Sequence, residues 1–501
     1  MKFRKLTAGL LALSMVGTFV PASAPILTVC AEEEAATSGT CGENVTWSFD
    51  KSTGTLTIRG QGDLSNYNSY SDVPWYSCKS GIKTVVIEEG VTSIGDYAFC
   101  FCTSLTSITI PDSVKSIGDY TFSWCVFLTS VTIPDNVTSI GSYAFDDCSA
   151  LTSVTIPDGV LSIGDRAFMY CTSLTSVSIP DSVTSIGDSA FNHCKSLTSV
   201  TIPDSVTSIK SWTFSDCQSL TTVIIPNSVT WIGGYAFNEC KSLTAINIPD
   251  SVTSIENGTF FGCENLTTIA IPDDVTSIGS NAFSDCTSLT SVTIPDGLTS
   301  IGGNAFDGCT ALTSVSIPDS VIRIGAFAFY RCGLLTSVTI PDGVTSIGQW
   351  TFASCKSLTA VTIPDSVTSI VDDALDGCTN LTISGYENST AQAYAEKKGY
   401  KFESLGEAPT PESPAPEETA LGDVSGDSKV DSSDAADLLI ALAKMGAGED
   451  AGLTDAQKAA ADADGNGELN AADATVILQY AAYIGAGGEG TLQEFLASQT
   501  A

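Results

Sequence analysis

Two stretches near the C-terminal end carry side chains that could bind a hard cation. Residues 423–434 read DVSGDSKVDSSD and residues 462–473 read DADGNGELNAAD. Each has oxygen-bearing side chains at positions 1, 3, 5, 9 and 12, and calcium takes about six to eight oxygen ligands. Two calcium ions are therefore expected. Their expected ligands are Asp423, Ser425, Asp427, Asp431, Asp434 and the backbone carbonyl of Lys429 in the first loop, and Asp462, Asp464, Asn466, Asn470, Asp473 and the backbone carbonyl of Glu468 in the second.

A helix is expected behind each loop, because residues 435–444 and 474–483 are both largely apolar. A single acidic loop would be a weak signal, but a duplicated loop with a helix each time is a strong one. A Pro-rich stretch runs almost to Leu421, so no helix is expected before the first loop. Position 12 is aspartate, whereas an EF-hand has glutamate there.

These features make residues 421–485 resemble a type I dockerin. The resemblance implies calcium-dependent docking onto a cohesin domain of a scaffolding protein in the cellulose-degrading complexes of anaerobic bacteria. Ser425 and Ser428 depart from the asparagine and glycine expected there, and the two halves differ at the recognition positions, so two equivalent docking modes are not expected. The positions that correspond to cohesin-binding residues are Ser432, Ser433, Leu439 and Ile440 in the first half, and Ala471, Ala472, Leu478 and Gln479 in the second.

The largest part of the chain is a repeat without insertions or deletions. Thirteen cysteines recur every 23 residues from Cys102 to Cys378, and leucine, phenylalanine and an Ile-Pro pair recur in the same frame. A period of about 20 to 29 residues is typical of leucine-rich repeats. No unit can bury its apolar side alone, so the units are expected to stack and to bury these columns in one continuous core.

Within a unit such as residues 151–171, apolar and hydroxyl residues alternate up to Pro157, which predicts a half-buried strand. Residues 160–163 predict a second short extended piece, and the Ala-Phe-x-x-Cys segment fits one helical or 3₁₀ turn. The units resemble BspA-like leucine-rich repeats, of the bacterial surface antigen type, across about residues 76–383. The expected fold class is an α/β repeat solenoid, dominated by β structure, followed by a small all-α calcium-binding dockerin.

The cysteine column is expected to consist of buried free thiols. Seventeen cysteines in an exported chain would usually indicate disulfides. In a stacked column, however, every member has the same environment and thirteen is an odd number, so small hydrophobic side chains are the better interpretation. Cys41 and Cys78, which flank the N-terminal segment, are the better disulfide candidates.

The first residues predict export. A basic start, an apolar core over residues 6–20 and small residues after it describe a signal peptide, with cleavage expected after Ala31. Reading Cys30 as a lipoprotein cysteine is an alternative, although Val29 is larger than the residue usually found before it. No later stretch is long enough to span a bilayer. The protein is therefore expected outside the cell, either secreted or held at the surface or in a cellulosome through the dockerin.

The net charge of −36 makes nucleic acid and anionic membranes poor partners. Part of this charge is periodic, because aspartate follows the repeat proline in every unit from Asp112 to Asp365 except at Asn227. A solubilising column in the turns is the simpler interpretation, and weak cation binding along this ridge is the alternative.

The chain divides into seven expected segments. They are a signal peptide (1–31), an N-terminal cap (32–75), the repeat solenoid (76–383), a C-terminal cap (384–405), a Pro- and Glu-rich linker (406–420), the dockerin (421–485) and a C-terminal tail (486–501).

The ligand of the repeats is open at this stage. Outward strand positions are nearly all Thr or Ser, a pattern disturbed only near Ile224, Asn247 and Ala270. The position two residues before the repeat phenylalanine varies more from coil to coil and is often aromatic. These aromatic side chains could stack on a polysaccharide, anchor a protein partner or simply cover the turn. The aromatic members of this column, the tentative ligand-binding residues, are Tyr97, Tyr120, Tyr143, Trp212, Tyr235, Phe327 and Trp350.

Catalysis is not expected. His193 is the one histidine in the chain, which removes most Ser-His-Asp, Cys-His and zinc arrangements. Carboxylates are abundant, but no insertion is large enough to form the cleft that a glycosidase needs. The expected function is a secreted, non-catalytic protein whose repeats recognise a protein or polysaccharide and whose dockerin attaches it to a cohesin-bearing scaffold. The alternatives are a cell-surface adhesin for protein ligands and a polysaccharide hydrolase component.

Overall fold

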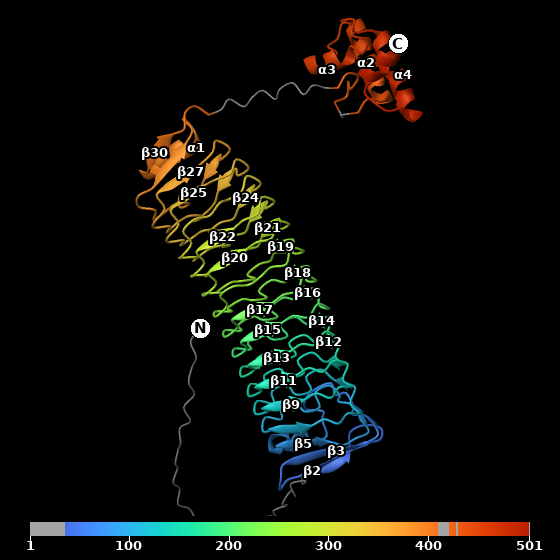
Figure 1. The fold of residues 1–501 in the computed structure, drawn as a ribbon, viewed down its shortest axis with the longest axis vertical. Helices are drawn as coiled ribbons and strands as arrows, with labels where there is room; N and C mark the ends of the chain where they lie inside the picture. The colour runs from blue at the N-terminus through green and yellow to red at the C-terminus, as the bar shows by residue number, and fades with distance from the viewer. Residues whose placement is uncertain (1–35, 409–419, 427–428, 500–501) are drawn as a thin grey trace, which may run out of the picture. The chain divides into compact units, whose positions relative to one another are not determined.

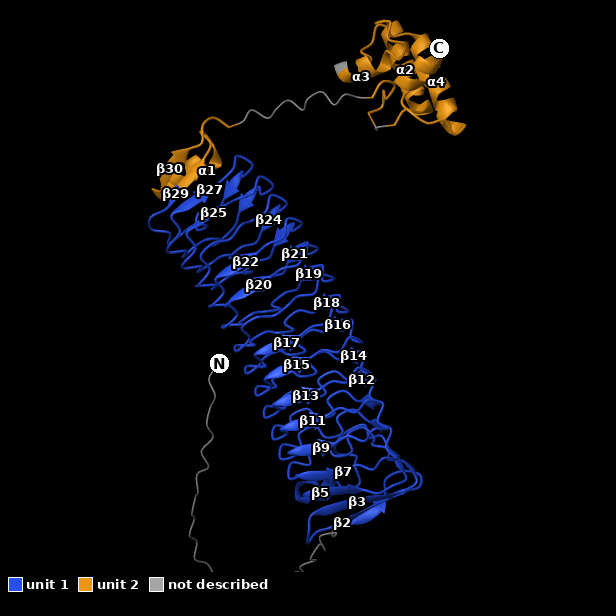
Figure 2. Ribbon diagram, in the orientation of Figure 1, with its two compact units in different colours: residues 1–382 blue, residues 383–501 orange. Residues whose placement is uncertain are grey.

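The computed structural model describes residues 36–408, 420–426 and 429–499. The expected signal peptide, Cys30, Asp427, Ser428 and most of the expected linker lie outside these residues. The chain forms two compact units, residues 1–382 and 383–501 (Figure 2). Each unit is described by itself.

The first unit begins with an antiparallel sheet that passes into the repeats. In the segment expected to be the N-terminal cap, β2 and β3 pair antiparallel, and β3 then pairs in parallel with β5, the first repeat strand. Trp75 is fully buried here, and its indole Nε1 donates to the Ala98 carbonyl at 2.8 Å. The elements are β1 (Ser38–Thr40), β2 (Val45–Asp50), β3 (Thr55–Gly60), β4 (Gly62–Asp63), the 3₁₀ helix η1 (Tyr76–Gly81), β5 (Thr84–Ile87) and β6 (Val91–Ser93).

Most repeat coils contribute a strand to a first parallel ladder, visible as the stacked arrows of Figure 1, and the exceptions are the coils of residues 245–247 and 314–316. Neighbours are in register at the repeat period, so that Ser153 pairs with both Ser130 and Ser176. Because the outward residues are hydroxyls and the central one is apolar, the strands are exposed on one face and buried on the other. These strands are β7 (Ser107–Thr109), β9 (Ser130–Thr132), β11 (Ser153–Thr155), β13 (Ser176–Ser178), β15 (Ser199–Thr201), β17 (Thr222–Ile224), β20 (Thr268–Ala270), β22 (Ser291–Thr293), β25 (Ser337–Thr339) and β27 (Ala360–Thr362).

A second ladder follows the repeat proline in each coil, as the sequence pattern predicts. Its strands are short and are also paired in parallel, as in Ser139 with Ser116 and Ser162. They are β8 (Ser116–Ile117), β10 (Ser139–Ile140), β12 (Ser162–Ile163), β14 (Ser185–Ile186), β16 (Ser208–Ile209), β18 (Trp231–Ile232), β19 (Ser254–Ile255), β21 (Ser277–Ile278), β23 (Ser300–Ile301), β24 (Arg323–Ile324), β26 (Ser346–Ile347) and β28 (Ser369–Ile370).

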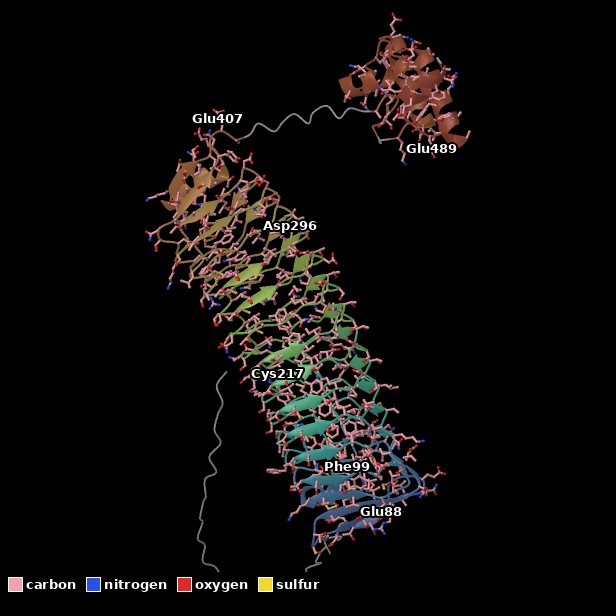
Figure 3. The ribbon with its side chains drawn as sticks, viewed as in Figure 1. Glu88, Phe99, Cys217, Asp296, Glu407 and Glu489 are labelled. Carbon is pink, nitrogen blue, oxygen red and sulfur yellow. The ribbon has the colours of Figure 1, made fainter. Side chains whose placement is uncertain are left out.

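The core of the coils is built from the columns that the sequence shows. The repeat phenylalanines from Phe99 to Phe352 are fully buried, and each ring stacks on the next, with centroid distances between 5.1 and 5.9 Å. Phe99 and Cys217 lie inside the coils, whereas Glu88 and Asp296 are exposed (Figure 3). The repeat fold is therefore confirmed.

The buried thiols are confirmed as well. Every cysteine that the structure describes is free. From Cys125 to Cys378, each sulfur of the column donates to the phenylalanine carbonyl of the preceding coil, as Cys217 Sγ does to Phe191 O at 3.3 Å. The disulfide considered for Cys41 and Cys78 is not formed in the structure, where Cys78 Sγ donates to the Trp75 carbonyl.

The Ala-Phe-x-x-Cys segment differs from the expected helical or 3₁₀ turn. It consists of separate turns, each closed by a hydrogen bond from a backbone amide to the carbonyl three residues before it, such as Cys100 N to Tyr97 O at 3.0 Å. No continuous helix forms, because residues in the left-handed region recur within it, as at Tyr97 (φ 59°) and Phe101 (φ 60°). This conformation turns alternate amides towards the next coil, where Phe99 N donates to Thr121 O at 2.8 Å.

The second unit begins with β29 (Thr382–Gly385), α1 (Thr390–Lys398) and β30 (Lys401–Ser404). The helix α1 and the strand β30 lie in the segment expected to be the C-terminal cap. Ser389 caps the start of α1 by accepting from Gln392 N, and Gly399, in the left-handed region, ends it.

Four helices complete the second unit. They are α2 (Ser432–Gly446), α3 (Asp455–Ala461), α4 (Ala471–Gly485) and α5 (Leu492–Gln499). Their core contains Leu438 of α2 and Ile477 of α4, both fully buried, and Leu492 and Phe495 of α5. The last helix falls in the segment expected to be a tail, and it packs into this core. Among the described residues, no helix is long and apolar enough to cross a membrane.

Candidate functional site

The second predicted calcium loop gathers three carboxylates. Oxygens of Asp462, Asp464 and Asp473 lie within 4.8 Å of one another, a cluster that could hold a metal ion. Asp473 is fully buried at the start of α4, and its carboxylate accepts from Asp464 N at 3.2 Å and from Asn470 N at 2.9 Å. These amide bonds fix the carboxylate at the centre of the loop.

The polar atoms of this loop fit a cation. Asp462 Oδ2 accepts from Gly467 N at 2.9 Å, but Asp462 Oδ1 is buried and has no hydrogen-bond partner among the described residues. A buried anionic oxygen without a partner is costly, and a cation would satisfy it. Gly465 and Gly467 are both in the left-handed region, with φ of 73° and 84°, which permits the tight turn around this point.

The other predicted ligands of the second loop line the same turn. Asn466 Oδ1 accepts from Glu468 N at 2.7 Å, and the Glu468 carbonyl accepts from Asn470 Nδ2 at 3.0 Å. Asn470 is also the N-cap of α4, where its Oδ1 accepts from Ala472 N. The six predicted residues therefore belong to one continuous turn that ends in the first turn of α4.

The first loop repeats this arrangement. Asp434 is fully buried in the first turn of α2 and accepts from the amides of Val424, Ser425 and Asp431 at 2.8 to 3.0 Å. Asp423 Oδ1 accepts from Gly426 N at 2.6 Å.

Asp431 caps α2, and hydrogen bonds from the amide and hydroxyl of Ser433 hold the pKa of its carboxyl below the ordinary value. The Lys429 side chain points to solvent. Asp427 and Ser428 are outside the described residues.

The positions predicted to bind cohesin are all exposed. Ser432 and Ser433 open α2, and Ala471 and Ala472 open α4. Apolar exposure on these helices is unusually high. Leu439, Ile440 and Leu478 have exposed fractions of 45%, 54% and 45%, and Gln479 is exposed beside Leu478. A surface of this kind is typical of a protein interface.

Sequence reasoning missed α3 and α5. Both carry a capping signal that could have revealed them. Thr454 and Gln457 form a capping box at the start of α3, and Thr491 and Glu494 exchange the same bonds before α5. Phe495 of α5 packs against the ring of Tyr483 at 5.1 Å, so α5 covers part of the C-terminal end of α4.

The predicted ring column of the repeats is stacked on itself. Tyr120 lies between Tyr97 and Tyr143 at centroid distances of 4.7 and 4.4 Å, with nearly parallel planes. Trp212 stacks on Tyr235 at 4.2 Å. Both faces of an inner ring such as Tyr120 are therefore covered by its neighbours, which leaves mainly ring edges for a ligand.

Phe327 and Trp350 end the column, at 5.9 Å from one another. The Trp350 indole donates to Asp373 Oδ2 at 2.6 Å. Trp212 remains the most accessible member, with an exposed fraction of 40%.

His193 has a specific environment. Its Nδ1 contacts Asp216 Oδ2, and its ring stacks on Tyr170 at 4.4 Å. Burial opposes ionisation of Asp216, but hydrogen bonds from Gln218 and His193 outweigh it, so the pKa of Asp216 is lowered. In the part of the chain that the structure describes, no hydroxyl or thiol is hydrogen-bonded to the His193 ring, which leaves the pair without a nucleophile.

Comparisons with known proteins agree with this geometry. A family described as "BspA type Leucine rich repeat region (6 copies)" matches residues 74–198, 161–290 and 276–395, and the dockerin type I domain matches residues 421–480. The chain is similar to a leucine-rich repeat protein from Bacteroides ovatus, at 32% identity and a TM-score of 0.62, over 73% of this chain and 99% of that one.

A leucine-rich cell surface protein from Faecalibacterium prausnitzii is also similar, at 30% identity and a TM-score of 0.41, over 76% of this chain and 97% of that one. No curated protein matches the chain.

Proposed function

Since the chain belongs to the BspA-type leucine-rich repeat family and carries a type I dockerin domain, we propose that it is a secreted, non-catalytic binding protein attached to a scaffold. Both domains are of non-catalytic kinds. The dockerin docks onto a cohesin domain, as in a cellulosome, and the repeats hold a protein or polysaccharide ligand. Such a protein would bring the scaffold and the ligand of its repeats together.

Type I dockerins bind calcium, and the proposal here is two ions, one in each loop. Asp462, Asp464 and Asp473 would hold the second ion, with Asn466, Asn470 and the Glu468 carbonyl completing the site. When bound, the cation neutralises the clustered carboxylates. The protein's own amides, such as those that donate to Asp434 and Asp473, keep the loops in place against α2 and α4.

The docking surface is proposed to lie on α2 and α4. The exposed Leu439 and Ile440 would supply the apolar contact, since clustered apolar anchors carry most of the energy of an interface. In the second half, Leu478 is followed by the polar Gln479, and Phe495 covers part of the helix end. The α2 half is therefore the favoured face.

The observation that carries the proposal is the carboxylate cluster of the second loop, with its partnerless buried oxygen at Asp462. The test is binding of the full chain to an immobilised cohesin domain, in calcium and then in chelator. We expect binding in calcium alone, and its loss in Leu439→Asp/Ile440→Asp.

The matched control is Leu478→Asp, which changes the equivalent leucine of the other half and should leave most of the binding. Circular dichroism in calcium shows that each variant is folded. Binding that persists in chelator, or that survives both sets of substitutions, would contradict the proposed docking.

A further inference from the structure

One place on the first ladder departs from an otherwise uniform surface. The outward-facing residues at the end of the first-ladder strands, one in each coil from Thr109 to Thr362, form a file along the surface. This file contains Thr or Ser in every coil but three. The exceptions, Ile224, Asn247 and Ala270, are consecutive. A second outward-facing file lies two residues earlier in each coil and runs from Ser107 to Ala360. In this file the coil of Asn247 carries alanine, at position 245.

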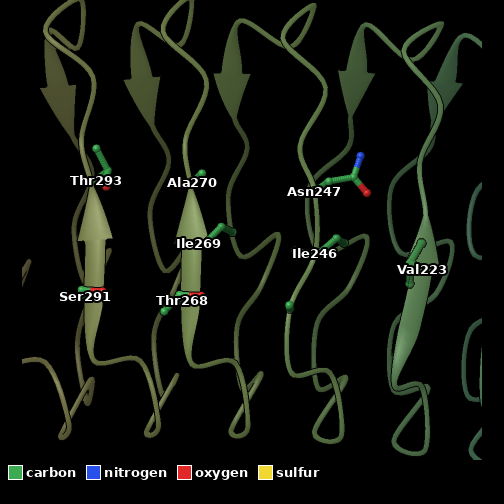
Figure 4. A pocket seen from close by; sticks show the side chains of 9 residues that line it. Val223, Ile246, Asn247, Thr268, Ile269, Ala270, Ser291 and Thr293 are labelled. Atoms are coloured by element: carbon green, nitrogen blue, oxygen red, sulfur yellow. The ribbon is translucent and has the colours of Figure 1, made fainter.

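The structure has a hollow at this place, with a volume of about 630 Å³. Figure 4 shows the residues that line it on four successive coils. Residues 246 and 269 belong to its lining, although the Ile246 and Ile269 side chains are buried in the core, and Ala245 and Ala270 leave space where most other coils carry hydroxyl side chains. The remaining lining residues are Val223, Asn247, Thr268, Ser291 and Thr293.

The ladder is also open here. β17 and β20 belong to separate sheets, and residues 245–247 between them form no strand. Among the described residues, no backbone hydrogen bond joins 245–247 to either neighbouring strand. Within the described ranges, the peptide groups of this coil, like those of residues 314–316, make no ladder bond, so those of 245–247 can donate to or accept from a ligand beside the hollow.

The side chains present both polar and apolar groups but no charge. Asn247 Nδ2 donates to the Ile225 carbonyl at 3.1 Å, which fixes the amide and leaves its Oδ1 to accept from a ligand. Thr268, Ser291 and Thr293 add hydroxyls. Ile224, with an exposed fraction of 54%, provides an apolar border. In the coil of Ile224, the periodic aspartate is replaced by Asn227.

We propose that this hollow binds a neutral sugar segment of a polysaccharide. A sugar ring combines an apolar C–H face with hydroxyls that donate and accept, which matches the small Ala245 and Ala270 and the exposed Ile224, edged by amide, hydroxyl and peptide groups. Four coils at roughly 5 Å each span roughly 15 Å, which is longer than one ring. An acidic polysaccharide is disfavoured by the net charge of −36, and a basic peptide would find no carboxylate in the lining.

This inference rests on the proposed function and names the ligand class of the repeats. The test uses the full chain in calcium. The variant Ile224→Thr/Asn247→Thr/Ala270→Thr restores the residue that most other coils carry in this file, so the stack should tolerate it. The matched control, Ser178→Thr/Ser316→Thr, makes the same kind of change in the same file away from the hollow. Ala270→Thr alone is a milder second variant.

Binding is measured by affinity electrophoresis in xyloglucan, mixed-linkage β-glucan and galactomannan, with polygalacturonate as the acidic polysaccharide and fibronectin and gelatin as protein probes. We expect a neutral polysaccharide to retard the wild type and the control. The triple variant should lose about tenfold or more in affinity, as when central contacts of a site are removed, and Ala270→Thr should lose less.

Equal retardation of the wild type and the triple variant would overturn the sugar site and leave the proposed function intact. Retention on the protein probes alone would overturn the ligand class, and a loss of that retention in the triple variant would make the occupant a polypeptide. If the folded wild type bound none of the probes, the role of the repeats in the proposed function would itself fail.

Discussion

Neutralising Asp464 should change stability in opposite directions with and without calcium. Oxygens of Asp462, Asp464 and Asp473 lie within 4.8 Å of one another. Two unit charges at that separation repel by about 0.9 kcal/mol at the permittivity of water and by about 3.5 kcal/mol at an effective permittivity of 20. Asp464 is exposed, so the lower figure applies, and its two pairs together amount to about 2 kcal/mol.

In chelator, Asp464→Asn removes this repulsion, so the free energy of unfolding of the helical domain should rise by up to about 2 kcal/mol. The substitution preserves shape and Oδ1 can still accept from Asn466 N, but the bond that Asn466 Nδ2 donates to Oδ2 is lost, which makes the expected gain an upper value. In calcium, the variant lacks one charged ligand. A tenfold loss of affinity lowers the stabilisation by saturating calcium by about 1.4 kcal/mol, so the calcium-induced gain should be clearly smaller than in the wild type.

The assay is urea unfolding of the full chain followed by far-ultraviolet circular dichroism. The helical part of the signal comes from α1 and from α2 to α5, because η1 is the one helix among the described residues of the first unit. Asp437→Asn is the control, since Asp437 is exposed on α2 outside both loops. If Asp464→Asn destabilised the domain in chelator as well, or if the control behaved in the same way, the electrostatic reasoning would be refuted.

Three further predictions concern the solenoid. Phe214→Ala should lower the free energy of unfolding by about 3 to 5 kcal/mol, because the ring is fully buried, whereas Trp212→Ala in the same coil should cost about 1 kcal/mol; urea melts compare them.

Burial raises the pKa of the cysteine thiols in the column, at Cys378 from 9.0 to about 11. The stability that these neutral thiols contribute is complete below about pH 9 and is lost as the pH rises towards 11. The free energy of unfolding measured across this range should fall steeply, and a flat profile would contradict the prediction. Burial, and then the charge of Asp147, raise the pKa of Asp146 to about 6, so Asp146→Asn should stabilise the chain at neutral pH, by about 1 to 2 kcal/mol after allowance for partial exposure, and should have no effect near pH 4.

The sequence predicted correctly the features that depend on the 23-residue repeat or on a single calcium loop. The buried phenylalanine and cysteine columns follow from spacing alone, and the first turns of α2 and α4 follow from the duplicated loops. It failed where a distant partner decides the conformation. The left-handed residues at Tyr97 and Phe101 are stabilised by amides that bond to the next coil, and no local pattern of residues indicates such bonds.

The surface hollow lies between these cases. The sequence shows three unusual residues in succession, Ile224, Asn247 and Ala270, but not that they border an open cavity. Residues 245–247, which form no strand, belong to its lining, and no local residue pattern shows that this coil lacks the ladder bonds of its neighbours. Similarly, the sequence contains the caps of α3 and α5, but the packing of Phe495 under α4 depends on tertiary contacts.

The left-handed column has a consequence for how such a chain can change over time. At these positions the main chain makes the bond between coils, as Tyr143 N does to Asp165 O and Asn281 N to Gly303 O. The side chains at these positions do not take part in this backbone hydrogen bond, and Tyr, Arg, Ser, Trp, Gly, Asn and Phe all occupy the column. A solenoid built in this way can acquire new side chains along one edge by single substitutions, although a neighbouring ring must move where it already fills the space, as Tyr235 does at Gly258, where a Cβ would lie 2.2 Å from the ring.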